Sequence, residues 1–155
     1  MSLKRMFKLK HKMPPRVENR KLTEKEFYNL LDNSDDGQSI KEYDNSYDLF
    51  DKSIKSFGIV INNIPIYAGC VIDSPIGKTT ESMLRNGCRE KYAFTLYKIV
   101  KKKAQEWAAC FGVLRCYMYL DGSEESNLVF NWIKKMGYSV EGFVDNRYVM
   151  ALYAK

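Results

Sequence analysis

The sequence is poor in the residues and patterns that several common protein classes need. It has one histidine, His11, and its four cysteines form no Cys-x-x-Cys pair, so a zinc site has little to build on and we expect no metal. No apolar run approaches the roughly 20 residues of a membrane-spanning helix. The basic N-terminus is not followed by the apolar stretch of a secretory signal. We therefore expect a cytoplasmic domain with free, mostly buried thiols.

Positive charge is concentrated at the start of the chain. The formal net charge of the 155 residues is +6. Residues 1–25 contain nine Lys or Arg and two Glu, a net of +7, so the remaining residues carry −1. We expect a basic tail over residues 1–15 and one domain over residues 16–155. Residues 1–25 would bind a protein or nucleic acid, or anionic lipid; the alternative is a solvated extension.

The first half of the sequence predicts a strand, two helices and a hairpin. Thr23 and Glu26 form a capping-box pattern at the start of a helix. Apolar residues at a spacing of three to four predict a second helix from Tyr43 to Phe57, ended by Gly58. Asn62-Asn63 between two apolar runs indicates a hairpin turn. The remaining predicted strands are Arg16–Leu22 and, as one alternative to a helical turn, Thr79–Leu84.

The second half predicts a long helix over residues 92–111, which ends at Gly112. It is followed by an apolar strand, residues 113–120, expected to be covered on both faces. A shorter helix then presents Trp132 and Ile133, and a final hairpin turns at Asp145-Asn146. This order indicates an α/β (α+β) fold, a mixed and largely antiparallel sheet with helices on both faces.

This order of elements and the segment Ser126–Tyr138 resemble the GNAT superfamily, the acyl-CoA-dependent N-acetyltransferases, over roughly residues 16–154. The segment reads SNLVFNWIKKMGY and is similar to the late family segment that ends in a glycine-aromatic pair. The resemblance implies two central strands that part from each other. It also implies that the backbone of Tyr117, Met118 and Tyr119 pairs with the pantetheine arm of acetyl-CoA.

The positions that serve the cofactor in that family are altered here. The family's pyrophosphate loop falls at residues 83–90, where the glycine spacing differs and Glu90 adds negative charge. The resemblance still assigns pyrophosphate binding to Arg85, Gly87, Cys88 and Arg89. Ile133 occupies the position of the family's proton-donating tyrosine, and Ser126 that of a frequent asparagine.

Two carboxylates after the apolar strand are candidate catalytic bases. Asp121 and Glu124 would accept a proton from an amine at the C-terminal edge of the sheet. The alternative is that they stabilise the start of the following helix, where negative charge meets the helix dipole.

Two functions are consistent with these features. The first is a non-catalytic acetyltransferase-like protein that uses no cofactor. A looser resemblance of residues 84–143 to a small internal virion protein of short-tailed phages points to a phage protein or virion component, located in the host cytoplasm or the virion. The second is an active acetyl-CoA-dependent N-acetyltransferase with a degenerate loop. The altered loop favours the first.

Two further patterns resemble ligand loops incompletely. Gly77-Lys78-Thr79 looks like the end of a phosphate-binding loop, but the glycine required at position 72 is Ile72. Residues 32–43 resemble a calcium loop, with Glu42 one residue short of the bidentate position. We expect both segments to be ordinary loops.

Overall fold

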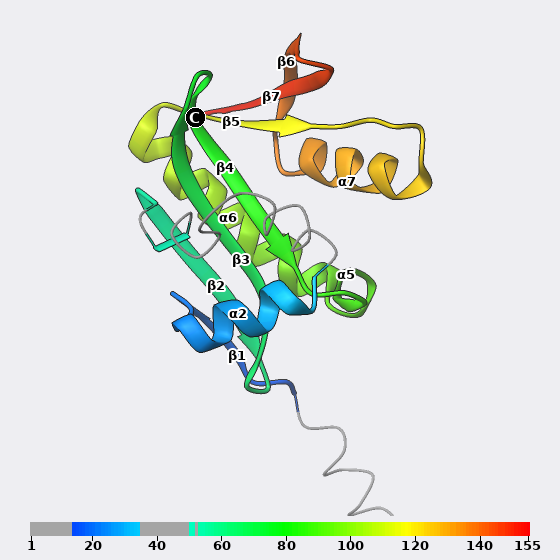
Figure 1. Ribbon diagram of the computed structural model, residues 1–155. Coiled ribbons are helices and arrows are strands. Elements are labelled where there is room, and N and C mark those ends of the chain that lie inside the picture. Colours follow the sequence, from blue (N-terminus) through cyan, green and yellow to red (C-terminus); the bar gives the residue numbers. More distant parts are fainter. Residues whose placement is uncertain (1–13, 35–49, 52) are drawn as a thin grey trace, which may run out of the picture.

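The computed structural model describes residues 14–34, 50, 51 and 53–155. The described helices are α2 (Glu24–Asp32), α5 (Cys88–Lys91), α6 (Ala93–Phe111) and α7 (Glu124–Lys135). The strands are β1 (Val17–Arg20), β2 (Lys55–Ile61), β3 (Ile64–Ser74), β4 (Gly77–Leu84), β5 (Val113–Met118), β6 (Ser139–Val144) and β7 (Arg147–Tyr153). They form one sheet in the order β1-β2-β3-β4-β5-β7-β6, in which only β4 and β5 run parallel (Figure 1).

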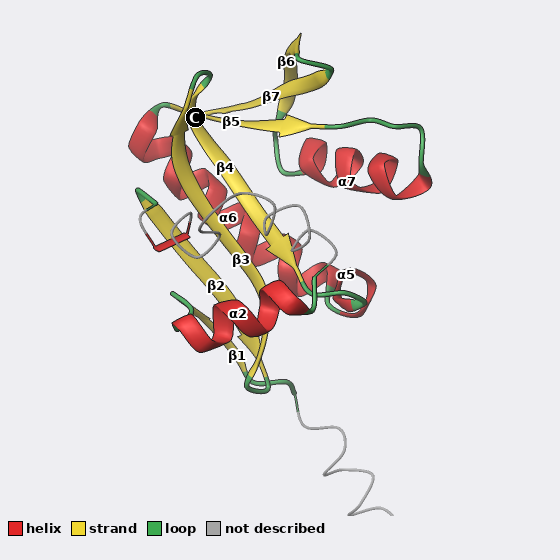
Figure 2. Cartoon of the chain, in the orientation of Figure 1, coloured by secondary structure: helices red, strands yellow, loops and turns green. Residues whose placement is uncertain are grey.

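Helices cover both faces of this sheet, as the sequence predicts (Figure 2). On one face α2 packs through Phe27, Leu30 and Leu31 onto β3 and β4. On the other face α6 packs through residues such as Leu96 and Trp107 onto a larger core. Successive residues of β3 alternate between the two cores, because side chains along a strand point to opposite faces. Among the described residues no helix is long and apolar enough to cross a membrane.

Local sequence signals account for several boundaries. The Thr23 side chain accepts a hydrogen bond from the Glu26 amide at 3.2 Å, and Glu26 accepts one from the Thr23 amide at 2.9 Å, which confirms the capping box. Asn62 and Asn63 both have positive φ, as a tight hairpin turn requires.

The predicted helix over residues 43–57 is wrong at its C-terminal end, and residues 43–49 lie outside the described part. Lys55–Phe57 belongs to β2, and Gly58 lies inside the strand rather than ending a helix. A Cβ atom at position 58 would lie 2.3 Å from Leu22 Cδ2, so glycine there permits the close approach of Leu22.

The two central strands part from each other. β4 and β5 share one paired position, Thr79 with Arg115, and beyond it they diverge (Figure 1). The expectation that the apolar strand is covered on both faces is wrong for β5. Leu114, Cys116 and Met118 are buried, whereas the alternate residues are half-buried because they face the side away from α6.

Candidate functional site

The space between the diverging ends of β4 and β5 is a cleft of about 520 Å³. Side chains of α6 and α7 form its apolar side. They include Val100, Ala104 and Trp107 from α6 and Val129, Trp132 and Ile133 from α7. The cleft therefore has the size and the mixed apolar and polar lining that are typical of small-molecule sites.

The helix α7 packs against the edge of the larger core, and three of its apolar residues also line the cleft. None of its residues is fully buried, and Trp132 and Ile133 are half-buried in the cleft wall. Trp107 is buried and Trp132 is half-buried; both pack in the larger core and both line the cleft. Ile133, at the position of the family's tyrosine, places an aliphatic group in the wall.

A charged group that the sequence did not point to lies on the β4 side of the cleft. Glu81 pairs in register with Cys70, so it faces the same side of the sheet as the α2 core. Burial raises the pKa of its carboxyl, and the charge of Arg147 on β7 partly offsets that effect. Glu81 therefore has a more basic carboxylate than an ordinary surface glutamate.

Arg147 lies over an aromatic ring of the neighbouring strand. Its guanidinium carbon is 3.6 Å from the centroid of the Tyr117 ring and 5.9 Å from that of Tyr119. Its Nε atom is buried and has no hydrogen-bond partner among the described residues. Glu81 and Arg147 were missed because they lie 66 positions apart, on strands that only the fold brings to the two sides of β5. The sequence around Glu81 contains no motif that points to it.

A buried hydroxyl lies near the point where the strands part. The Tyr138 side chain is buried and lines the cleft, and its hydroxyl is 3.5 Å from Thr80 Oγ1. Burial raises the pKa of Tyr138, so this group stays protonated at neutral pH. Tyr138 therefore places a hydroxyl proton in the cleft wall, whereas the Ile133 side chain in the same wall has no proton to donate.

Arg85, in the loop before α5, is committed to contacts within the protein. The Arg85 Nε donates to the Pro65 carbonyl at 2.7 Å, and its Nη2 donates to Asn29 on α2. The Arg85 carbonyl accepts a hydrogen bond from the Cys88 amide at 3.2 Å. Arg85 therefore holds the loop to β3 and α2 and does not line the cleft.

The other predicted loop ligands are distributed differently. Gly87 has φ of 75° and precedes α5, which is one turn long, and Cys88 is buried. Arg89 lines the cleft, and its Nη1 lies 4.0 Å from Glu125 on α7. The structure thus brings one of the two predicted arginines to the cleft, beside a carboxylate.

Of the two predicted catalytic carboxylates, Glu124 begins α7, whereas Asp121 lies before the helix and lines the cleft. Asp121 Oδ1 accepts a hydrogen bond from the Ser123 amide at 2.8 Å. Hydrogen bonds from Ser123 and Ser126 lower the pKa of Asp121 to about 2, which makes it a weak base. Glu124 lies in the first turn of α7 and is exposed, and it does not line the cleft, although Glu125 does. This placement fits the helix-start alternative.

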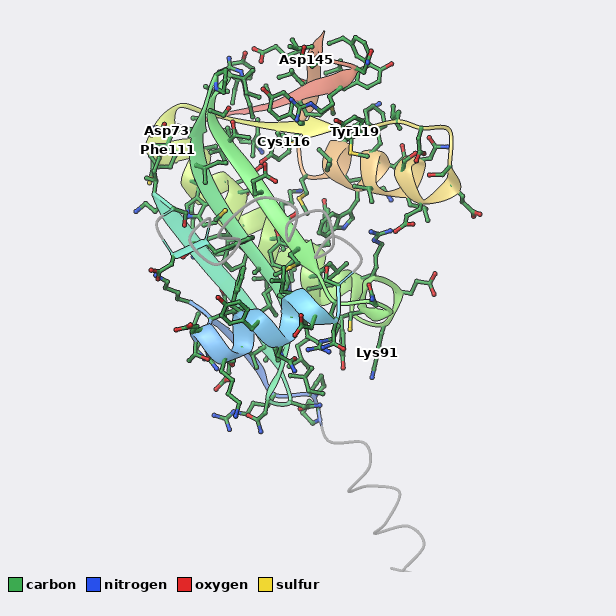
Figure 3. The ribbon with its side chains drawn as sticks, in the orientation of Figure 1. Asp73, Lys91, Phe111, Cys116, Tyr119 and Asp145 are labelled. Atoms are coloured by element: carbon green, nitrogen blue, oxygen red, sulfur yellow. The ribbon has the colours of Figure 1, made fainter. Side chains whose placement is uncertain are left out.

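The predicted pantetheine strand does border the cleft. Tyr117, Met118 and Tyr119 line it, and their backbone lies beyond the paired position Thr79–Arg115. Cys116 and Tyr119 lie in order along β5, Cys116 nearer the meeting point with β4 (Figure 3). Among the described residues no group of three or more His, Cys, Asp or Glu could hold a metal ion.

Comparison with known proteins supports the fold. No family model and no curated protein matches the sequence. The structure is similar to that of Ard1 from Thermoplasma volcanium, with 10% identity, coverage of 90% of this chain and 98% of that chain, and a TM-score of 0.64. An aminoglycoside N(6')acetyltransferase from Legionella pneumophila matches with 14% identity, 92% and 95% coverage and a TM-score of 0.58. A GNAT family acetyltransferase from Streptococcus agalactiae matches with 15% identity, 90% and 96% coverage and a TM-score of 0.59. The chain therefore has the fold of the GNAT acetyltransferases.

Proposed function

We propose that this chain is a non-catalytic protein with the GNAT fold, which acts by binding a partner and uses no cofactor. The observation that carries the proposal is the closed loop before α5. The Arg85 side chain donates hydrogen bonds to the Pro65 carbonyl and to the Asn29 side chain. The Arg85 carbonyl accepts a hydrogen bond from the Cys88 amide. A pyrophosphate cradle needs free amides and free cationic side chains, and the Arg85 side chain and the Cys88 amide are already used.

The electrostatics of the loop favour the same conclusion. Arg89, the remaining predicted cation, lies beside Glu125, and Glu90 adds another carboxylate within α5. The pantetheine side of the cleft fits acetyl-CoA, because the β5 backbone from Tyr117 to Tyr119 borders it. The pyrophosphate end of the cleft does not fit acetyl-CoA, because carboxylates accompany the remaining cation there. The cleft has therefore kept its shape while the anchor for the cofactor has been lost.

Calorimetric titration with acetyl-CoA tests this proposal. We expect no binding heat at a cofactor concentration of about 1 mM, which corresponds to a binding free energy weaker than about −4 kcal/mol. Binding at micromolar concentration that is lost in Arg89→Ala and kept in the matched variant Lys91→Ala would contradict it. Arg85 is not used for this comparison because its replacement disturbs the loop itself.

The enzyme alternative is supported by one specific observation, the half-buried Glu81 in the cleft. A carboxylate with a raised pKa is suited to take a proton from an amine that enters beside it. If this alternative holds, Glu81→Gln abolishes acetyl transfer to a primary amine, whereas Asp121→Asn and Glu124→Gln leave it nearly unchanged. Transfer with this pattern would replace the first proposal.

The partner-binding role is assigned to residues 1–25, whose net charge is +7. A role as a phage protein or virion component, and with it a location in the host cytoplasm or the virion, stays a prediction from the sequence. Deletion of residues 1–15 should abolish retention on the partner, with a steep salt dependence if the partner is nucleic acid. Unchanged retention would contradict the role of the tail.

A further inference from the structure

The described part of the chain carries a basic surface whose residues do not line the cleft. It consists of five lysines on α6, at the end of α7 and at the C-terminus. We call this surface the basic face: Lys98, Lys101, Lys102, Lys135 and Lys155. The near-neutral net charge of residues 26–155 conceals it, because the acidic side chains lie mostly elsewhere.

The lysines of the basic face lack acidic partners among the described residues, whereas most other cations have them. Arg20, Lys78 and Arg115 each form an ion pair with a carboxylate. The helix α6 contains one acidic residue, Glu106, and its carboxylate pairs with Lys103 at 3.4 Å. Lys98 and Lys102 are four residues apart on one helix, a like-charge spacing that costs a few tenths of a kcal/mol. The face is therefore an unneutralised concentration of positive charge.

Two hollows flank the α6 lysines and give the face a shape. One hollow, of about 360 Å³, is lined by Lys98, Lys102 and Asn19 of β1, together with Lys103 and its ion-pair partner Glu106. The other, of about 210 Å³, is lined by Lys101, Lys135 and Lys155. The Tyr97 hydroxyl fixes part of this arrangement, because it accepts from Lys101 at 3.2 Å and donates to the Lys135 carbonyl at 3.0 Å.

The chemistry of these hollows fits a phosphate backbone better than a bilayer or a protein surface. Gln105 and Ser139 accompany the lysines in the second hollow, whose floor also includes Met136 and Leu152, and the apolar side of α6 is turned into the core. A membrane-binding helix would present a broad apolar face outward, and a stable protein interface needs an apolar centre. Phe94, which is 74% exposed, is the large apolar side chain at this end of α6, and Lys98 lies over its ring. An exposed ring beside lysines suits base stacking.

We propose that the basic face binds the phosphate backbone of a nucleic acid, alongside the basic tail. Asn19, which lines one of the hollows, belongs to β1, the first described strand after the basic tail in the sequence. This inference deepens the proposed binding role by naming the partner class and a second surface. It is independent of whether acetyl-CoA binds.

Fluorescence anisotropy with labelled DNA of about 20 base pairs, and with its single strand, tests the proposal over a range of salt concentrations. The full-length double variant Lys101→Gln with Lys102→Gln is compared with Lys55→Gln with Lys91→Gln, which removes the same charge elsewhere. We expect the first pair to weaken binding about tenfold or more and to reduce the salt slope by about 2. The second pair should change both quantities much less.

Three results would overturn the proposal. Equal weakening by the two double variants would show a non-specific effect of net charge. Binding would be assigned to the tail alone by two results together. Deletion of residues 1–15 would abolish DNA binding, and Lys101→Gln with Lys102→Gln in the intact chain would leave the affinity unchanged. Capture by phosphatidylserine vesicles without DNA binding would assign the face to lipid. Thermal unfolding of each variant confirms that the comparison is between folded proteins.

Discussion

Arg115 and Glu141 form a two-point ion pair beside the place where β4 and β5 meet. Arg115 Nε lies 2.6 Å from one carboxylate oxygen and Nη2 lies 3.1 Å from the other. Arg115 Nη1 also donates to the Ile76 carbonyl at 3.1 Å, and the Tyr153 hydroxyl donates to the same carboxylate. One guanidinium therefore joins the turn before β4 to β5 and β6, at the end where the cleft is closed.

The first prediction concerns this ion pair. Glu141→Gln should lower the melting temperature by about 2–4 °C at neutral pH, because the bidentate geometry is lost while the side-chain shape is kept. The Arg115 guanidinium lowers the pKa of Glu141 to about 2, from an ordinary value near 4.5. A lowered acid pKa stabilises the fold above the ordinary value, and this stabilisation is lost as pH falls from about 5 towards 2.

The difference in melting temperature between wild type and Glu141→Gln should therefore shrink over that acidic range. Differential scanning calorimetry at a series of pH values measures it. Glu106→Gln, which removes a more exposed ion pair with Lys103, serves as the matched control and should have little effect. A difference that stays constant down to pH 2 would show that the ion pair does not stabilise the fold.

The second prediction concerns Arg85. Arg85→Ala should destabilise the protein by about 1–2 kcal/mol, because the Pro65 carbonyl and the Asn29 side chain lose a charged donor. Chemical denaturation measures this change. Arg89→Ala, which loses a single long ion pair, should have an effect below about 0.5 kcal/mol. Equal effects of the two substitutions would argue against a structural role for Arg85.

The third prediction concerns Glu81. Burial raises its pKa, so the folded state binds its proton more tightly than the unfolded state does. For such an acid, stability falls as pH rises from the ordinary value of about 4.5 through the raised value. Glu81→Gln should therefore raise the melting temperature at pH 8 and have a much smaller effect at pH 4. A lower melting temperature at pH 8 would indicate that the charged form is well stabilised, for example by Arg147.

The sequence predicted those elements whose signals are local. The capping box at Thr23 and the turn at Asn62-Asn63 depend on neighbouring residues, and both are confirmed. The prediction of a helix that ends at Phe57 failed because the apolar residues 47, 50, 54 and 57 happen to have helical spacing. Tertiary pairing with β3 makes the last part of that segment a strand instead.

The site was less predictable than the fold, because its groups are brought together from distant parts of the chain. The family resemblance predicted that Tyr117 and Arg89 bind the cofactor, and both residues line the cleft. Glu81 and Arg147 carry no local motif, so only the sheet order, in which β5 separates β4 from β7, brings their charges near each other. The contacts of Arg85 with Asn29 and Pro65 depend on how α2 packs, which spacing along the chain does not reveal.

The fourth prediction concerns the cysteines, which the described structure leaves as free thiols. Cys110 is exposed, whereas burial raises the pKa of both Cys70 and Cys116 to about 12. The thiolate is the reactive form, so these two should resist alkylation in the folded protein. Brief treatment with iodoacetamide at pH 8 should modify Cys110 alone, as measured by peptide mass spectrometry, and all four cysteines after denaturation. Cys110→Ser should remove the fast reaction; rapid modification of Cys116 instead would show that the parted strands open far enough to expose the core.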